Sequence, residues 1–422
     1  MSTIDNLLSG IPIPRMIKVR QTFERPQVAD VAGELARKIR AGGAFARVKP
    51  GDRVGVTAGS RGITNLPLIL KTVASEIRLA GGEPFVFPAM GSHGGATAEG
   101  QRDMLAGMGI TEQSVGAPIR SSMETVEIGV SSNGFPVHID RFAYEADGVV
   151  VVNRVKPHVA FRGPCESGLM KMIVIGMGKQ KGADICHELG FGTMAENLQT
   201  MGRVTLAKVN ILCGVALLEN AYHETARVEV LGRDEIPLRE PALLEEAWKL
   251  YPKLYFDRLD VLVIDEIGKD ISGTGFDTNV VGRYHTPFVS GGPTITRVAC
   301  LDITERSHGN ANGLGILDFT TRRAFDKFDF DNTYPNSLTS TVPTSVKIPM
   351  VLKSDRQAIQ AAIKTCNILK KVEVRLARIR NTVALDQIAV SENLIPEVRS
   401  HARLAIVGEP FELQFDASGN LF

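Results

Sequence analysis

One stretch of the chain, residues 155–188, concentrates side chains that can do chemistry. It reads VKPHVAFRGPCESGLMKMIVIGMGKQKGADICHE. Imidazoles exchange protons near neutral pH, and an amine freed of its proton is a nucleophile. The groups of these two kinds that we single out are His158, Lys171, Lys179, Lys181 and His187. Their density among glycines and prolines makes this stretch the first candidate for a functional site.

A buried strand is expected directly before this stretch. The run from Asp147 to Val155 contains consecutive valines from Val149 to Val152. A continuous β-branched run is typical of a parallel strand that is covered on both faces. Open α/β sheets bind their ligands beyond the carboxyl ends of such strands. The imidazoles and amines that follow are therefore expected at a position where α/β proteins place their chemistry.

Lys171 lies inside an apolar run. Leu169 and Met170 precede it, and Met172 and Ile173 follow it. Such a lysine either extends its ammonium group to solvent along an apolar stem or is desolvated and made nucleophilic. The residues alone leave both interpretations open.

A second polar loop is predicted between a strand over residues 52–59 and a helix over residues 66–80. The loop begins with Gly59, Ser60 and Arg61. Backbone N–H groups at a helix N-terminus, together with an arginine, can hold a phosphate group. A surface turn with a solvated arginine is the alternative.

A third polar loop, residues 90–97, follows a strand predicted over residues 83–89. His93 lies between Gly91 and Gly94 in this loop. Glycines give the backbone freedom and leave room for a ligand. His93 is therefore a candidate proton carrier, with an uninvolved loop histidine as the alternative.

Strands alternate with helices along the chain of 422 residues. This alternation predicts an α/β protein with two α/β domains, a cleft between them, and mostly parallel sheets flanked by helices. We predict an N-terminal domain over residues 1–257, which carries the candidate site, and a smaller C-terminal domain over residues 258–390. The tail, residues 391–422, is expected to pack back on the N-terminal domain.

Composition argues against several classes of partner. The formal net charge is +1, so no overall field draws the chain to nucleic acid or to an anionic membrane. No apolar run approaches the roughly 20 residues that cross a bilayer, and the N-terminus lacks the features of a signal peptide. The five cysteines are scattered and show no CxxC spacing, which argues against a disulfide framework. We therefore expect a cytoplasmic protein without nucleic-acid or membrane partners.

Taken together, these residues resemble the nickel-dependent lactate racemase family, which includes other 2-hydroxyacid racemases and epimerases. The motifs that carry the resemblance are Val155-Lys-Pro-His158, Ser167-Gly-Leu-Met-Lys171, Cys186-His187 and Gly91-Ser-His93.

The resemblance implies a cofactor, the nickel-pincer nucleotide (nickel pyridinium-3,5-bisthiocarboxylic acid mononucleotide). It implies that Lys171 tethers this nucleotide as a thioamide and that His187 is the protein ligand of nickel. Sulfur and imidazole donors suit nickel in a square-planar field. The phosphate of the nucleotide would be held by Gly59, Ser60 and Arg61, with Lys179 as a further contact.

The resemblance also implies an isomerase activity, the inversion of C2 in a 2-hydroxyacid. His93 and His158 would be the acid and base that serve opposite enantiomers, while hydride passes between C2 and the cofactor. The predicted substrate contacts are Arg162, Lys269, Asp277 and Asn279. The loop that carries Lys269, Asp277 and Asn279 is rich in polar groups. It favours a sugar acid over lactate, because buried polar groups need hydrogen-bond partners that the methyl group of lactate cannot supply. The implied partners are this substrate and the proteins that synthesise the cofactor, and a homo-oligomer is left open.

Two alternatives remain at this point. The first is an oxidoreductase that uses a free nicotinamide cofactor, against which no GxGxxG with a downstream acidic residue follows the early strands. The second is a non-catalytic protein that binds the nickel-pincer nucleotide. It is kept because the family often has an acidic residue three positions before the loop arginine, where this chain has Ala58.

Overall fold

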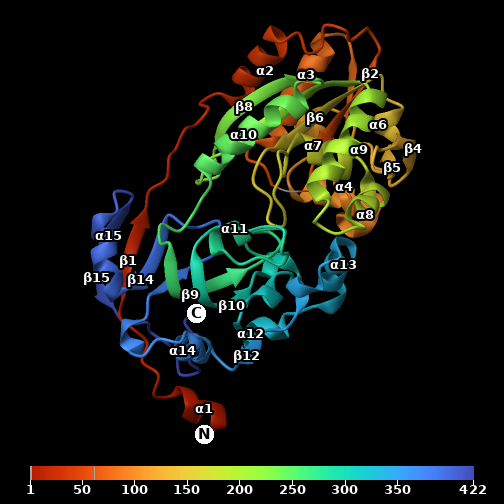
Figure 1. The fold of residues 1–422 in the computed structure, drawn as a ribbon. Coiled ribbons are helices and arrows are strands. Elements are labelled where there is room, and N and C mark those ends of the chain that lie inside the picture. The colour runs from red at the N-terminus through yellow and green to blue at the C-terminus, as the bar shows by residue number, and fades with distance from the viewer. Residues whose placement is uncertain (1, 61) are drawn as a thin grey trace. The chain divides into compact units, whose positions relative to one another are not determined.

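The structure is a computed structural model that describes residues 2–60 and 62–422. The chain forms two compact units (Figure 1). Unit 1 combines Met1–Phe23 with Pro252–Phe422, and unit 2 is Glu24–Tyr251. Each unit is an α/β structure, and the predicted fold class of mostly parallel sheets flanked by helices is confirmed.

Unit 2 is built on a five-stranded sheet with the order β3-β2-β6-β7-β8. The first four strands in this order are parallel, and β8 is antiparallel to β7. A separate antiparallel hairpin, β4 and β5, turns at Gly134, which has a φ of 88°, a backbone conformation that glycine adopts easily. The strands are β2 (Arg53–Ala58), β3 (Glu83–Pro88), β4 (Thr125–Val130), β5 (Pro136–Asp140), β6 (Gly148–Arg154), β7 (Ile211–Glu219) and β8 (Thr225–Gly232).

Helices cover both faces of this sheet. On one face α2 and α3 pack on the valines of β2 and β6, which are fully buried as the continuous apolar run of β6 predicts. On the other face α7 and α10 approach β7 closely at Gly214, where a side chain would collide with Leu169 and Ile236. The helices of unit 2 are α2 (Val31–Ala41), α3 (Leu66–Leu79), α4 (Ala98–Gly107), α5 (Glu112–Val115), α6 (Arg141–Tyr144), α7 (Leu169–Lys171), α8 (Lys179–His187), α9 (Met194–Lys208) and α10 (Ile236–Leu250).

Unit 1 is built on an eight-stranded sheet with the order β12-β11-β10-β9-β13-β14-β1-β15. The strands from β12 to β13 in this order are parallel, and the last three pair antiparallel. The strands are β1 (Met16–Gln21), β9 (Arg258–Ile267), β10 (Thr294–Ile303), β11 (Phe319–Thr321), β12 (Met350–Leu352), β13 (Leu376–Ile379), β14 (Gln387–Ser391) and β15 (Leu404–Phe411).

The long buried helix of unit 1 is α14, which packs across β9 to β12 and contributes Ile359 and Ile363 to the core. In the described residues, no helix combines the length and the apolar character needed to cross a bilayer. The helices of unit 1 are α1 (Thr3–Leu8), α11 (Thr278–Val281), α12 (Arg322–Asp326), α13 (Phe330–Ser340), α14 (Asp355–Thr365) and α15 (Ile395–Ser400).

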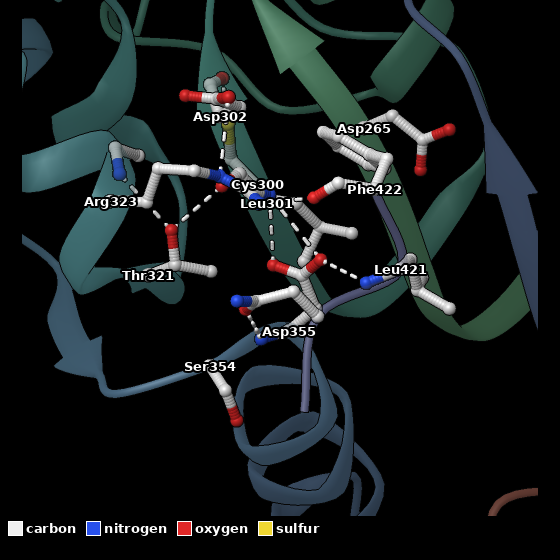
Figure 2. A network of polar contacts seen from close by, with 12 residues as sticks. Asp265, Cys300, Leu301, Asp302, Thr321, Arg323, Ser354, Asp355, Leu421 and Phe422 are labelled. Carbon is white, nitrogen blue, oxygen red and sulfur yellow. Dashed lines mark hydrogen bonds and ion pairs between the residues drawn. The ribbon is translucent and has the colours of Figure 1, made fainter. Parts of the chain in front are cut away.

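The tail, residues 391–422, belongs to unit 1, where β15 pairs with β1 in the eight-stranded sheet. Unit 2, which carries the candidate site, contains neither the tail nor β1, although β1 lies within the N-terminal domain predicted over residues 1–257. Figure 2 shows the last two residues, Leu421 and Phe422, beside the polar side chains of Arg323 and Asp355 in the same unit. The backbone N–H of Leu421 donates to Asp355 Oδ2 over 2.8 Å, and Arg323 donates to the carbonyl of Phe422 over 2.7 Å.

Candidate active site

The candidate site of unit 2 begins at one edge of its sheet. Because β2, β3 and β6 are parallel, the loops that follow them leave the sheet at the same edge. These loops begin at Gly59, Ala89 and Val155 and carry the residues that the sequence singled out. The fold thus delivers three separate segments to one place, as α/β sheets do at a ligand site.

Lys171 and His158 are in direct contact. Lys171 Nζ lies 2.8 Å from His158 Nε2, and both side chains are half-buried. The backbone N–H of Ala160 donates to the other ring nitrogen, His158 Nδ1, over 3.2 Å. Lys171 ends the short helix α7 and is followed by a π-helical turn, Met172–Gly176, a type of distortion that is frequent at functional sites.

His187 is the last residue of α8, and its Nδ1 atom is sealed from solvent without a hydrogen-bond partner among the described residues. Burial, with the positive charge of Lys171 as the second cause, lowers the pKa of His187 to about 4. The ring is therefore neutral at pH 7, which is the form that binds a metal. An orphaned nitrogen on a neutral, desolvated imidazole fits the role of a metal ligand.

Two phenylalanines join the histidines of the site. The ring of Phe191 lies 5.9 Å from that of His158 and 5.2 Å from that of His187, measured between centroids. Phe161 packs on His158 at 4.5 Å. Sequence reasoning missed Phe191, because an aromatic residue in a loop has no pattern that marks it as part of a site.

His93 lies in the loop after β3, and its Nδ1 atom is 2.7 Å from the carbonyl oxygen of Met90. A carbonyl only accepts, so Nδ1 carries the hydrogen and Nε2 is the basic nitrogen of the neutral ring. The loop is held against the segment of Lys171 and His187, since the Gly91 N–H donates to the Gly176 carbonyl over 3.2 Å. Gly94 has a φ of 68° and no room for a side chain, which explains the glycine there.

Glu166 and Arg162 brace the loop of His158. The buried carboxylate of Glu166 accepts from the backbone N–H of His158 over 2.6 Å. Arg162 Nη1 donates to the His158 carbonyl over 2.7 Å, and its guanidinium lies 4.9 Å from the ring centre of Trp248. The contacts of Arg162 thus support this loop, and its predicted grip on a substrate carboxylate stays a prediction.

Glu240 caps the helix that carries Lys171. The residue before α7 is Gly168, which has no side chain to cap the helix, and the capping group comes from α10. Glu240 is fully buried, and its Oε2 accepts from the Met170 N–H over 2.9 Å, whereas Oε1 has no hydrogen-bond partner in the part of the chain that the structure describes. Burial raises the pKa of Glu240 to about 7, although hydrogen bonds from the Met170 and Leu169 N–H groups oppose the shift.

Lys179 does not support its predicted contact with a cofactor phosphate. Its ammonium is fully buried and lies 2.9 Å from Asp140 Oδ2. It also donates to the Pro88 carbonyl over 2.6 Å and to Gln101 Oε1 over 3.1 Å. Two of the three ammonium hydrogens are used in these hydrogen bonds, and the ion pair with Asp140 engages the ammonium from a further side. Lys179 instead anchors the start of α8 to the end of β3.

The predicted phosphate loop lies beside the segment of Lys171. A Cβ atom at Gly59 would lie 3.1 Å from the end of the Met172 side chain, so the loop passes close to this residue. Ser60 follows it and is half-buried. Arg61 lies outside the described residues. Gly59 and Ser60 are therefore placed next to the residue after the proposed tether.

The three predicted substrate contacts of the second domain lie in unit 1. Lys269 Nζ donates to the Gly273 carbonyl over 2.9 Å and to Asn336 Oδ1 over 2.7 Å. Asp277 caps α11 by accepting from the Asn279 N–H over 3.0 Å, and both residues are buried. Their role toward a substrate stays a prediction.

Comparison with known proteins identifies the class of unit 2. Residues 28–199 match the model of the lactate racemase N-terminal domain. The match agrees with the resemblance found in the sequence, which is confirmed. No curated protein matches the chain.

A solved structure agrees with the chain over most of its length. The lactate racemase apoprotein from Thermoanaerobacterium thermosaccharolyticum superposes with a TM-score of 0.53 at 14% sequence identity. The match covers 88% of this chain and 99% of that chain. At this identity the similarity establishes the fold alone.

Proposed function

We propose that the protein is an isomerase, a lactate racemase-like enzyme that inverts C2 of a 2-hydroxyacid. The observation that carries the proposal is the contact of Lys171 with His158 beside the neutral His187, inside a lactate racemase N-terminal domain. A lysine and two histidines of a motif that resembles this family are thus brought together by the fold.

The residues present fit a nickel-pincer nucleotide. Lys171 would tether it, His187 would bind its nickel, and Gly59 and Ser60 would contact its phosphate. In the described residues no group of three or more histidine, cysteine or acidic side chains gathers as a metal site. When bound, the nucleotide supplies a group that accepts and returns hydride.

The contact between Lys171 and His158 bears on the tethering. Because the Ala160 N–H points at Nδ1, the neutral ring carries its hydrogen on Nε2. A hydrogen on Nε2 faces the nitrogen of Lys171 and disfavours its charged ammonium form, so the contact favours release of the lysine proton when the tether forms. An uncharged amine is the nucleophilic form of lysine that forms an amide or thioamide.

His93 and His158 would move the proton of the substrate hydroxyl. A 2-hydroxyacid must lose this proton as C2 becomes a flat carbonyl carbon, and it regains a proton when C2 is reduced again. Imidazoles suit both steps because their usual pKa lies near neutral pH. Each histidine would serve one enantiomer as the base and the other as the acid.

The substrate we propose is a hydroxyl-rich 2-hydroxyacid such as a sugar acid, with Arg162, Lys269, Asp277 and Asn279 as contacts. Maturation of the enzyme would require the proteins that synthesise the nickel-pincer nucleotide. All five cysteines are free and buried, which suits the reducing conditions of the cytoplasm.

The test is a panel of enantiopure 2-hydroxyacids, lactate and sugar acids among them, given to protein that was produced together with the cofactor-making enzymes. Chiral chromatography should show one acid or a related group changing configuration at C2. His93→Gln and His158→Gln should each slow the inversion by about 100-fold or more, the contribution typical of a general acid or base.

Intact mass separates the tether from the catalysis. The mass of the protein should rise by that of the nucleotide, and Lys171→Ala should abolish the rise while Lys181→Ala, an exposed lysine of the next helix, should not. If nickel and nucleotide are bound but no acid changes configuration, the protein is a carrier and not an isomerase. Activity that instead requires added nicotinamide nucleotide would favour the oxidoreductase.

A further inference from the structure

A cavity of about 290 Å³ lies in unit 2 at the amino ends of β2 and β3. The candidate active site follows the opposite ends of these strands. Each strand has six residues and so spans about 20 Å, which makes the cavity a separate site. Its lining includes three arginines, Arg53, Arg78 and Arg120, and a single carboxylate, Glu83.

Arg120 is held in place by the sheet and by an aromatic ring. The Val86 N–H donates to the Pro118 carbonyl over 2.8 Å, and the Arg120 N–H donates to the Val86 carbonyl over 2.9 Å. These bonds fix the backbone of Arg120 along the edge of β3. Its guanidinium lies 4.8 Å from the ring centre of Phe85, and among the described residues it forms no ion pair with a carboxylate.

The other two guanidiniums are oriented by uncharged groups. Arg53 donates to the Glu145 carbonyl over 2.6 Å, and Arg78 donates to the Gly116 carbonyl. A backbone carbonyl orients a guanidinium without neutralising it, so the charge of each arginine persists. The ion pair of Arg53 with Asp147 is exposed and long, at 3.9 Å, and offsets little of that charge.

Glu83 lies directly across the strand pair from Arg53. Opposite charges at such positions often pair. In the described residues, however, Glu83 forms no ion pair with any arginine of the cavity. The cavity therefore keeps an excess of positive charge, with three guanidiniums against one carboxylate.

We propose that this cavity binds a small phosphate anion, either a phosphate monoester or pyrophosphate. The planar fork of arginine matches the oxygens of a phosphate group, and several pre-oriented guanidiniums can share one such anion. A volume of about 290 Å³ is at the small end for a ligand site, which excludes large cofactors. The site is independent of the proposed isomerase activity.

The experiment is a calorimetric titration of the full chain with inorganic pyrophosphate at low ionic strength. We expect binding that Arg120→Gln weakens by about tenfold or more, since a charge-assisted hydrogen bond is lost. Glu83→Gln should instead strengthen binding, because it removes the only negative charge of the lining. Arg203→Gln, which changes an exposed arginine of α9, is the matched control and should bind as the unmodified protein does.

Misfolding cannot explain opposite responses of the Glu83 and Arg120 variants, because a misfolded protein does not bind pyrophosphate more tightly. Ser60→Ala should leave the affinity unchanged; a loss there would assign the pyrophosphate to the loop after β2 and overturn the proposal. Equal affinity in Arg120→Gln, or no binding at millimolar pyrophosphate, would also overturn it. Tighter binding of citrate than of pyrophosphate would show a carboxylate site and contradict the phosphate assignment.

Discussion

The ammonium of Lys179 is surrounded by oxygen atoms of the protein, from Asp140, Gln101 and the carbonyl of Pro88. Burial lowers the pKa of Lys179, while the adjacent carboxylate opposes the shift. Through Gln101, whose Nε2 donates to the carbonyls of Gly91 and His93, this lysine also supports the loop of a proposed catalytic histidine. One buried group thus connects α8 to the loop of His93.

Lys179→Met should destabilise the protein by about 3–5 kcal/mol, because the substitution leaves the carboxylate of Asp140 buried without its partner. Denaturant unfolding followed by circular dichroism measures the loss. Lys181→Met, two residues further along the same helix and exposed, should change the free energy of unfolding by less than about 0.5 kcal/mol. The double variant Lys179→Met with Asp140→Asn should recover part of the loss. A Lys179→Met variant as stable as the control would contradict this account.

At the scale of residues, sequence reasoning could name candidates but could not separate their roles. Lys171 and Lys179 are both lysines of one glycine-rich stretch, and the sequence offered both as cofactor contacts. The difference is tertiary, because the partners of Lys179 come from β3, α4 and β5, far from it in the chain. Phe191 likewise could not be recognised from the sequence, because only the fold brings its ring against those of His158 and His187.

The short helix α7 depends on a neighbouring element. It has three residues, too few to be stable alone, and the carboxylate of Glu240 from α10 accepts from its first N–H groups. The same carboxylate fills the space over Gly168, where any side chain would collide with Oε1. The position of Lys171 therefore depends on a buried acid some seventy residues further along the chain.

This acid should make stability depend on pH. Because the pKa of Glu240 is raised from 4.5 to about 7 in the folded protein, the folded state favours the protonated form. The contribution of Glu240 to the free energy of unfolding is fully present below pH 4.5 and is lost as the pH rises through 7. The pKa difference corresponds to about 3 kcal/mol, an order-of-magnitude value.

Glu240→Gln keeps the shape and cannot ionise, so the fall in the free energy of unfolding between about pH 5 and pH 8 should become shallower. The measurement is denaturant unfolding at several pH values. Glu245→Gln, an exposed glutamate of the same helix, should keep the slope of the unmodified protein. Parallel curves for the unmodified protein and Glu240→Gln would show that Glu240 does not titrate in this range.

At the scale of elements, local patterns were informative where burial is continuous. The valines of β6 lie in a buried strand as the sequence predicted, and the strands predicted over residues 52–59 and 83–89 are present as β2 and β3. The cap of α7 has no local signal, because the group that satisfies its N–H groups is not next to it in sequence. Farther along the chain, α12 and α13 are divided around Asp329, whose side chain caps the second helix.

The two units differ in how the chain builds them. Unit 2 is one continuous segment, Glu24–Tyr251, and its sheet and core are formed within it. Unit 1 is discontinuous, because β1 inserts between β14 and β15. No local pattern indicates that a strand near the start of the chain pairs with strands near the end, so the sequence could predict two α/β domains but not this connection.

The discontinuity predicts how fragments of the chain will fold. A fragment of residues 24–251 should unfold cooperatively on heating, because all strands of its sheet are present. A fragment of residues 252–422 lacks β1, which leaves one edge of β14 unpaired and β15 without its partner. It should therefore lack a cooperative transition, as an incomplete sheet exposes unpaired backbone groups.

Joining residues 1–23 through a flexible linker to the end of residues 252–422 should restore cooperative unfolding, because β1 can then enter between β14 and β15. The matched control joins the same linker to a segment in which Val19, a buried residue of β1, is replaced by aspartate. A buried, unpaired carboxylate should prevent the insertion, so this version should behave like residues 252–422 alone. Thermal melts followed by circular dichroism distinguish the outcomes, and a cooperative melt of residues 252–422 alone would show that β1 is dispensable for unit 1.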